Sequence, residues 1–276
     1  MPFNTPDQPL RVTVWHEFRH EHTHPVVQKV YPDGMHTVKK AAIEEQTAAH
    51  FGRPVEVRTA TLDQDGEHGL SDEVLANTDV MTWWGHCAHG DVRDDIAAKV
   101  RQRVLEGMGL VVLHSGHYSK PFTGLLGTGG HLKWREAGEK ERLWVMRQGH
   151  PLTAGMTSDH ILIPQTEMYG EPFDIPEPDE LVFVSWFEGG EVFRSGCVFN
   201  RGAGRIVYLR PGHETFPIYY QPEIRRLLTN AVHYAAPDGR ALAYRTDSPM
   251  IGDPLEPIAS DHEIDEHFKN VQGGPA

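Results

Sequence analysis

The sequence lacks most features that mark a secreted, membrane or nucleic-acid-binding protein. Two cysteines in 276 residues, Cys87 and Cys197, are too few for a disulfide framework, and a reducing compartment fits this. No apolar run approaches the roughly 20 residues of a membrane span, and the first residues lack the pattern of a signal peptide. The net charge of −13 leaves no basic stripe for phosphates. We therefore expect a cytoplasmic protein with neither membrane nor nucleic-acid partners.

The length and the 39% hydrophobic content fit one large domain, or one domain with an appendage. Residues 237–276 contain much proline, aspartate and glycine and show little periodicity. We expect an α/β domain over residues 1–236, followed by an extended tail over 237–276. Because this tail cannot fold alone, and strands of the second half offer a pairing edge, we also expect a homo-oligomer.

The first half alternates strand and helix patterns. Strands are expected at 10–18, 55–62, 79–85 and 110–113, and helices at 36–51, 71–78 and 91–106. Short connections of this kind are typical of a parallel sheet covered by helices on both faces. Strand patterns with Gly-rich turns over 179–210 predict an antiparallel extension, and two further short strands are expected within 131–151. A helix is expected at 222–235, with Pro222 at its start.

Histidine is abundant, with 18 residues, and many follow directly after expected strands. His86 and His89 follow the third strand, and His114 and His117 follow the fourth. A histidine-rich surface is one interpretation. The other is a site that uses neutral imidazoles as metal ligands or proton carriers, because adjacent parallel strands bring their carboxyl ends to one edge of the sheet.

Two segments partly match known catalytic motifs, those of zinc proteases and of serine nucleophiles. Residues 16–20 match the zinc-protease motif H-E-x-x-H, but they follow a strand and precede Pro25, whereas the motif requires a helix. The turn from His114 to Tyr118 follows a strand as a nucleophile elbow does, but it lacks G-x-S-x-G. Ser115 is therefore a poor nucleophile candidate.

Metal or acid–base chemistry fits the imidazole and carboxylate groups better. Aromatic and bidentate polar groups near them suit a sugar ring, although core packing is the alternative for each aromatic residue. The candidate catalytic residues are His114, Glu167, His213 and Glu214. The candidate substrate-binding residues are Glu17, His20, Tyr118, Trp134, Tyr169 and Arg194. The candidate ligands of a divalent metal, zinc before others, are His86, His89 and His117.

Several segments together resemble the ThuA-like trehalose utilisation family over residues 10–235. They include VWHEFRHE, VMTWWGHCAHGDV, GMGLVVLHSGHYSKPF, LKWREAGEKERLWV and GRIVYLRPGHETFP. The resemblance implies a flavodoxin-like, class I glutamine amidotransferase-like three-layer sandwich with a mostly parallel sheet and an antiparallel edge extension. The amidotransferase cysteine–histidine–glutamate triad does not carry over, because the turn after the fourth strand holds Gly116, His117 and Tyr118. His16 also departs from the family pattern, where asparagine is usual.

The resemblance further implies a role in disaccharide catabolism, alongside dehydrogenases that produce 3-keto sugars. We therefore expect acid–base or metal-assisted isomerisation or hydrolysis of trehalose or a related disaccharide, in its 3-keto form. The partner is a small-molecule sugar, and no nucleotide cofactor is expected. The alternative is a non-catalytic sugar-binding or assembly protein on an amidotransferase-like scaffold.

Overall fold

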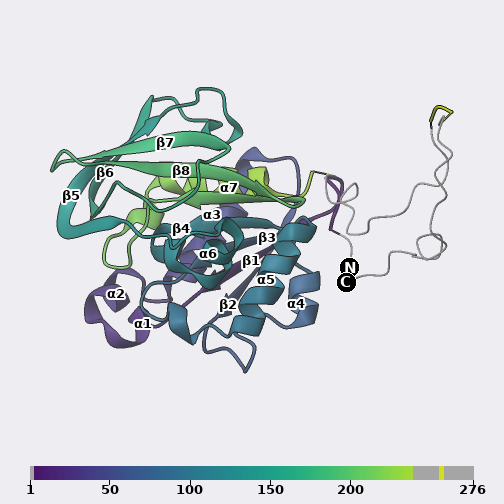
Figure 1. Ribbon diagram of the computed structural model, residues 1–276. Helices are drawn as coiled ribbons and strands as arrows, with labels where there is room; N and C mark the ends of the chain where they lie inside the picture. Colours follow the sequence, from purple (N-terminus) through teal and green to yellow (C-terminus); the bar gives the residue numbers. More distant parts are fainter. Residues whose placement is uncertain (1–2, 239–254, 258–276) are drawn as a thin grey trace.

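The computed structural model describes residues 3–238 and 255–257. One nine-stranded sheet runs through the molecule in the order β2-β1-β3-β4-β9-β8-β7-β5-β6 (Figure 1). The strands are β1 Leu10–His16, β2 Val55–Thr61, β3 Val80–Trp84, β4 Gly109–Leu113, β5 Lys133–Val145, β6 His160–Gly170, β7 Glu180–Phe187, β8 Val192–Arg201 and β9 Gly204–Leu209.

Seven α-helices and four short 3₁₀ turns connect these strands in the described part of the chain. The helices are α1 His20–Thr23, α2 Pro25–Val30, α3 Met35–His50, α4 Asp72–Ala76, α5 Asp94–Glu106, α6 Lys120–Leu126 and α7 Pro222–Ala235. The 3₁₀ turns are η1 His89–Asp91, η2 His114–Tyr118, η3 Pro151–Thr153 and η4 Ile218–Tyr220. None of the described helices is long and apolar enough to cross a membrane.

Five neighbouring strands form the parallel part of the sheet. β1 pairs in parallel with β2 and β3, and β4 pairs in parallel with β3 and β9. With β9 counted as the fifth parallel strand, the order is 2-1-3-4-5, which is the flavodoxin-like order. The predicted parallel α/β sheet is therefore confirmed, and the structure adds that β1, β3 and β4 are direct neighbours.

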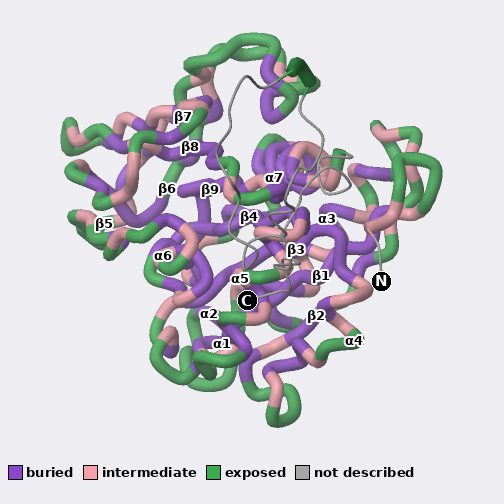
Figure 2. Tube along the Cα trace, turned by 45° about the vertical axis from the view of Figure 1, so that its right-hand side comes forward, coloured by how far each residue is buried: buried purple, intermediate pink, exposed green. Residues whose placement is uncertain are grey.

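Helices cover both faces of this parallel part, as the burial of β4 illustrates. Val111 and Leu113 pack into an apolar cluster with residues of α3 and α7. Leu110 and Val112, which point to the opposite face, pack with residues of α5 and α6. The central strands are consequently buried along their whole length (Figure 2).

The antiparallel extension is larger than expected. β8, β7, β5 and β6 continue the sheet beyond β9, so four of the eight pairings among the described strands are antiparallel. The prediction of two short strands within 131–151 is wrong, because β5 runs unbroken from Lys133 to Val145. Gly138, with φ +65°, lies where the register against β6 shifts, so the chain makes a bulge there instead of a turn.

Two smaller differences concern helices, at residues 20–30 and at the start of α5. Residues 20–30 form α1 and α2 rather than a polar loop, and Pro25 begins α2 instead of only ending a helix. α5 begins at Asp94, after Arg93 in an extended conformation, rather than at residue 91. The expected tail over 237–276 lies almost entirely outside the described residues.

Candidate functional site

The carboxyl ends of β1, β3, β4 and β9 lie side by side, so the residues that follow them gather at one edge of the sheet. β5 and β6 of the extension add side chains from the other side of this edge. The structure brings together most of the residues predicted from the sequence: His20, His86, His89, His114, His117, Tyr118, Trp134, Glu167, Tyr169, His213 and Glu214. The cluster contains two polar groups with different geometries.

The first group centres on His114 and Glu167, which are both buried. The Nδ1–H of His114 donates to the carbonyl of Arg210 at 3.1 Å, so Nε2 carries the lone pair in the neutral ring. The hydroxyl of Tyr169 lies 3.2 Å from this Nε2, and Oε2 of Glu167 lies 3.0 Å from it. That carboxylate oxygen has no donor among the described residues, so the pair gains a hydrogen bond when it takes up a proton.

Arg210 holds the backbone of Glu167 in place. Its fully buried guanidinium donates to the backbone carbonyl of Glu167 and to the hydroxyl of Thr166, and it forms an ion pair with Glu141. His114 has φ +49°, a strained conformation for a non-glycine residue and one that packed surroundings must hold in place. A Cβ at Gly212 would lie 2.8 Å from the Cβ of His114, so only glycine allows the two loops to approach this closely.

His213 supplies a donor to the same group. Its Nδ1 accepts from the backbone N–H of Thr215 at 3.1 Å, so the neutral ring carries its proton on Nε2. This Nε2 lies 3.8 Å from Oε2 of Glu167 and 3.6 Å from Oε1 of Glu136, and it makes no hydrogen bond to any described residue. An unpartnered buried N–H therefore faces the carboxylate of the His114–Glu167 pair.

The second group consists of His20, His86 and Glu214, which are adjacent to the first group through the His213–Glu214 peptide bond. Oε1 of Glu214 lies 3.3 Å from Nδ1 of His20 and 3.0 Å from Nδ1 of His86. The two Nδ1 atoms lie 3.4 Å apart. Burial opposes ionisation of Glu214, but its contact with His86 and the nearby His213 and His20 lower the pKa of this carboxyl, so it is an anion at neutral pH.

Glu17 holds the loop that carries His86. Its carboxylate accepts the backbone N–H groups of His86, Cys87 and Ala88 at 2.7, 3.0 and 2.9 Å. The thiol of Cys87 also donates to it, at 2.9 Å. Burial and this carboxylate raise the pKa of Cys87 to about 12, so its thiol stays protonated and is not a nucleophile at neutral pH.

A cavity of about 280 Å³ opens over the first group and next to His86. Trp134 and Tyr118 stand at its rim, with 65% and 43% of their surfaces exposed. Large aromatic faces at the mouth of a polar cavity can stack on a flat or ring-shaped ligand. The cavity is lined by His86, His89, Ser115, His117, Tyr118, Leu132, Trp134, Glu136, Glu167 and Tyr169.

Burial keeps three imidazoles of this region neutral at pH 7, whereas Glu214 raises the pKa of His86 against the effect of burial. Burial lowers the pKa of His89 to about 4, of His117 to about 3 and of His213 to about 4. Burial also lowers the pKa of His114, against the pull of Glu167. Burial opposes ionisation of Glu167, but its interactions with His114, His213 and the Arg210 guanidinium outweigh this and lower the pKa of its carboxyl.

Three of the predicted site residues make other contacts. Arg194, expected to bind substrate, lies outside the cavity and forms a bidentate ion pair with Glu171, which leaves its guanidinium engaged. Glu17 faces the backbone of the 86–88 loop. His117 donates from Nδ1 to the carbonyl of Gly130 at 2.7 Å, and it does not converge with His86 and His89 as a ligand set.

Sequence reasoning missed several polar residues near the site. The exposed Glu136 and the buried Arg210 both contact the first group. Glu136 lies two residues after Trp134, and Arg210 lies two residues before Gly212. Behind β1, Lys39 is fully buried with Nζ 3.3 Å from Nδ1 of His16. Its position on the apolar face of α3, four residues from both Met35 and Ile43, is a signal that could have revealed it.

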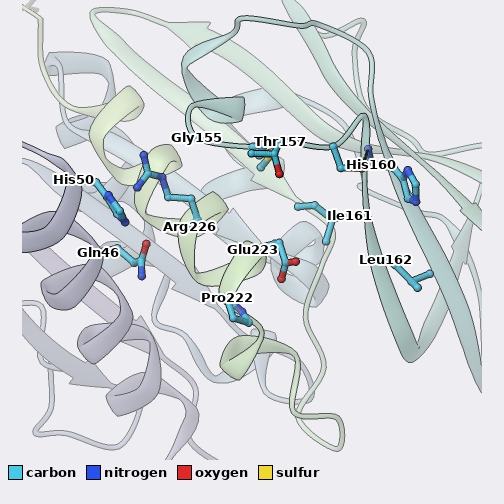
Figure 3. A pocket seen from close by; sticks show the side chains of 12 residues that line it. Gln46, His50, Gly155, Thr157, His160, Ile161, Leu162, Pro222, Glu223 and Arg226 are labelled. Atoms are coloured by element: carbon cyan, nitrogen blue, oxygen red, sulfur yellow. Dashed lines mark hydrogen bonds between the residues drawn. The ribbon is translucent and has the colours of Figure 1, made fainter.

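A larger cavity, of about 650 Å³, lies elsewhere in the molecule between α3, α7 and the segment 155–162 (Figure 3). His50, Arg226 and His160 approach it from three separate elements. The groups of converging imidazoles and carboxylates among the described residues do not include any residue of this lining. Convergent polar groups with shifted pKa values mark the smaller cavity as the candidate active site.

The sequence model of the ThuA family, described as trehalose utilisation, matches residues 11–235. A solved structure from Parabacteroides merdae, described as ThuA-like, is 14% identical with a TM-score of 0.61, covering 88% of this chain and 94% of its own. Another ThuA-like structure, from Bacteroides uniformis, is 16% identical with a TM-score of 0.57, covering 85% and 95%. A cytoplasmic protein from Salmonella typhimurium is 11% identical with a TM-score of 0.52, covering 82% and 100%.

At these identities the solved structures support a shared fold and nothing more. Among curated proteins, none matches the chain significantly. The family model, in contrast, spans most of the chain and includes every residue of the two polar groups. The expected family is therefore confirmed, and its description connects the chain with carbohydrate use. The chain belongs to the ThuA family of trehalose utilisation proteins.

Proposed function

We propose that this protein is an enzyme of disaccharide catabolism that removes a proton next to the carbonyl group of a 3-keto sugar. The observation that carries the proposal is the His114–Glu167 pair, which gains a hydrogen bond by taking up one proton and faces the unpartnered N–H of His213. A base that is neutral or anionic at rest, beside a donor for developing negative charge, is what enolisation requires.

A keto sugar fits the site better than an unoxidised disaccharide. The C–H bond next to a carbonyl is acidic because the resulting charge moves to oxygen, whereas trehalose itself has no such bond. The cavity of about 280 Å³ is at the small end of ligand sites, which span about 300–1,000 Å³, so it accommodates one sugar ring. The second ring of a disaccharide would lie outside, against Trp134 and Tyr118.

The proposed step balances without an oxidant or reductant. The pair of His114 and Glu167 accepts the proton, the C–H electron pair becomes a carbon–carbon double bond, and the carbonyl electron pair moves to oxygen. The Nε2–H of His213 donates to this oxygen. Return of the proton to the former carbonyl carbon, with loss of the neighbouring hydroxyl proton, gives the isomeric ketone. In a second outcome the enediolate re-forms the C3 carbonyl and expels the glycosidic oxygen from C1, which takes up a proton. Addition of water across the resulting C1–C2 double bond then completes hydrolysis.

Turnover measured by NMR tests the proposal. Trehalose and 3-keto-trehalose are each incubated with the purified full chain, and we expect a new product only from the keto sugar. His114→Ala and Glu167→Gln should fold normally and lower kcat by about 10²–10⁴-fold. His160→Ala, which changes the larger cavity, is the matched control and should keep wild-type activity.

Two results would overturn the proposal. Full activity in both the His114 and Glu167 variants would show that the chemistry occurs elsewhere. Line broadening of the sugar signals without any product, at enzyme concentrations near those of the sugar, would indicate a sugar-binding protein that does not catalyse a reaction.

A further inference from the structure

The geometry of His20, His86 and Glu214 points to a binding site for one divalent transition-metal ion, separate from the acid–base pair. Three possible ligand atoms converge there: Nδ1 of His20, Nδ1 of His86 and Oε1 of Glu214. The three residues come from three separate segments, α1, the loop after β3 and the loop after β9. We infer that these atoms bind the metal, with a fourth position open.

The spacing of the three atoms agrees with tetrahedral zinc. A tetrahedral ion with bonds of about 2.0–2.1 Å holds its ligands about 3.3–3.4 Å apart. The observed separations are 3.3 Å from Glu214 to His20, 3.0 Å from Glu214 to His86 and 3.4 Å between the two imidazole nitrogens. Two imidazoles and a carboxylate form a ligand set found in catalytic zinc sites, which keep the remaining position for water or substrate.

The surroundings also favour a cation at this position. Oε2 of Glu214 is buried and has no hydrogen-bond partner among the described residues. Glu214 and His20 expose only 4% and 9% of their surfaces, so the carboxylate charge cannot be balanced by bulk water. Glu17 holds the backbone of His86, Cys87 and Ala88, which orients the His86 ligand before any metal arrives.

The neighbouring group of His114, Glu167 and His213 does not share these properties. Its His213 nitrogen lies 3.8 Å from the carboxylate oxygen, and that nitrogen carries the proton because Thr215 donates to the other one. A protonated ring nitrogen is not a metal ligand. The two groups therefore divide the site into an acid–base part and a metal part, and His86 lines the cavity that Glu167 also lines.

This assignment differs from the ligand set expected from sequence spacing, which joined His86 to His89 and His117. His86 is common to both sets. Metal binding by His20, His86 and Glu214 does not depend on the proposed function. Only a role for the ion in holding a sugar oxygen at the cavity rests on the proposed function.

Calorimetric titration with zinc ions, in the absence of any sugar, tests the inference on the full chain after chelator treatment. We expect one equivalent of zinc to bind, and elemental analysis of the untreated protein should give the same ratio. Loss of one ligand in His20→Ala or Glu214→Gln should weaken binding by at least about 100-fold. His24→Ala, which changes an exposed neighbour of His20, and His117→Ala should bind zinc as the wild type does.

Circular dichroism and thermal unfolding show whether each variant is folded. If Glu214→Gln does not fold, His20→Asn takes its place as the second ligand variant. Zinc binding that is retained in folded His20 and Glu214 variants would overturn the assignment, as would the absence of stoichiometric binding to the wild type. Loss of binding in His117→Ala would favour the ligand set predicted from the sequence. Because no turnover is measured, failure of the proposed sugar reaction would leave this result unaffected.

Discussion

Replacing Glu17 with glutamine should destabilise the protein and weaken metal binding together. Oε2 of Glu17 accepts the N–H groups of His86 and Ala88, and Oε1 accepts the N–H and the thiol of Cys87. Glutamine keeps one acceptor oxygen and places an NH₂ group against the donors on the other side. At least one charge-assisted hydrogen bond, of about 1.5–3 kcal/mol, is lost, and a buried donor is left unpaired.

We therefore expect Glu17→Gln to lower the free energy of unfolding by about 2–4 kcal/mol, because these losses add within one buried loop. Urea unfolding at pH 7 measures this value, with Glu56→Gln on the exposed face of β2 as the matched control. The freed 86–88 loop should weaken zinc binding by about 10–100-fold. A folded variant as stable as the control would refute the assignment of Glu17 as the residue that positions this loop. A raised KM with unchanged stability would instead support the sequence-based expectation of direct substrate binding.

Three further predictions concern other parts of the molecule. Burial lowers the pKa of Lys39 from 10.5 to about 7. Between these two pH values the unfolded chain binds one more proton than the folded chain, so the free energy of unfolding should rise with pH by up to about 1.4 kcal/mol per pH unit. Lys39→Met should remove this slope in urea unfolding measured from pH 7 to 9.5. Trp134→Ala should raise KM for the keto sugar by about 2–12-fold with little change in kcat, since a stacking contact contributes about 0.5–1.5 kcal/mol, and an unchanged KM would remove Trp134 from the binding site. Trp144, Leu162 and Val192 are exposed on β5, β6 and β8, so Trp144→Glu should convert the expected homo-oligomer to a smaller species in light scattering, whereas a wild type that is monomeric would contradict that expectation.

Much of the fold follows from local patterns in the sequence. The strands of the parallel part are short, apolar runs, and the helices between them carry clear end signals. Ser71 accepts the N–H of Val74 at the start of α4, and Gly107, with φ +131°, ends α5. Because adjacent parallel strands end at one edge, the sequence also predicts that the histidines after β1, β3 and β4 lie close together.

The grouping of those histidines could not be predicted in the same way. Their shared position after the third expected strand suggested that His86 and His89 act together, but the contacts of each residue depend on loops that are distant in sequence. His86 meets Glu214, which follows β9, and His20, which follows β1. Local patterns also could not predict the length of the antiparallel extension. Gly138 allows β5 to continue through a bulge where a turn between two short strands was expected.

The buried polar residues show a further limit of sequence reasoning. Lys39 and Arg210 are residue types that usually lie at the surface, yet both are fully buried. In each case a specific partner contacts the polar group that has lost its contact with water. Arg210 pairs with Glu141 on β5, a residue 69 positions away, and Lys39 contacts His16 on β1. Such partners become visible only when the tertiary structure is known.

Deuterium exchange is the most direct test of the central claim, that the His114–Glu167 pair removes a proton next to a sugar carbonyl. 3-keto-trehalose is incubated with enzyme in D₂O, and NMR follows the loss of the proton signals adjacent to the carbonyl. The account predicts exchange far above the enzyme-free rate for wild type and for His160→Ala, and a rate lower by about 10²–10⁴-fold for His114→Ala and Glu167→Gln. Wild-type protein that leaves these signals at the enzyme-free rate, or variants that exchange them as fast as wild type, would contradict it.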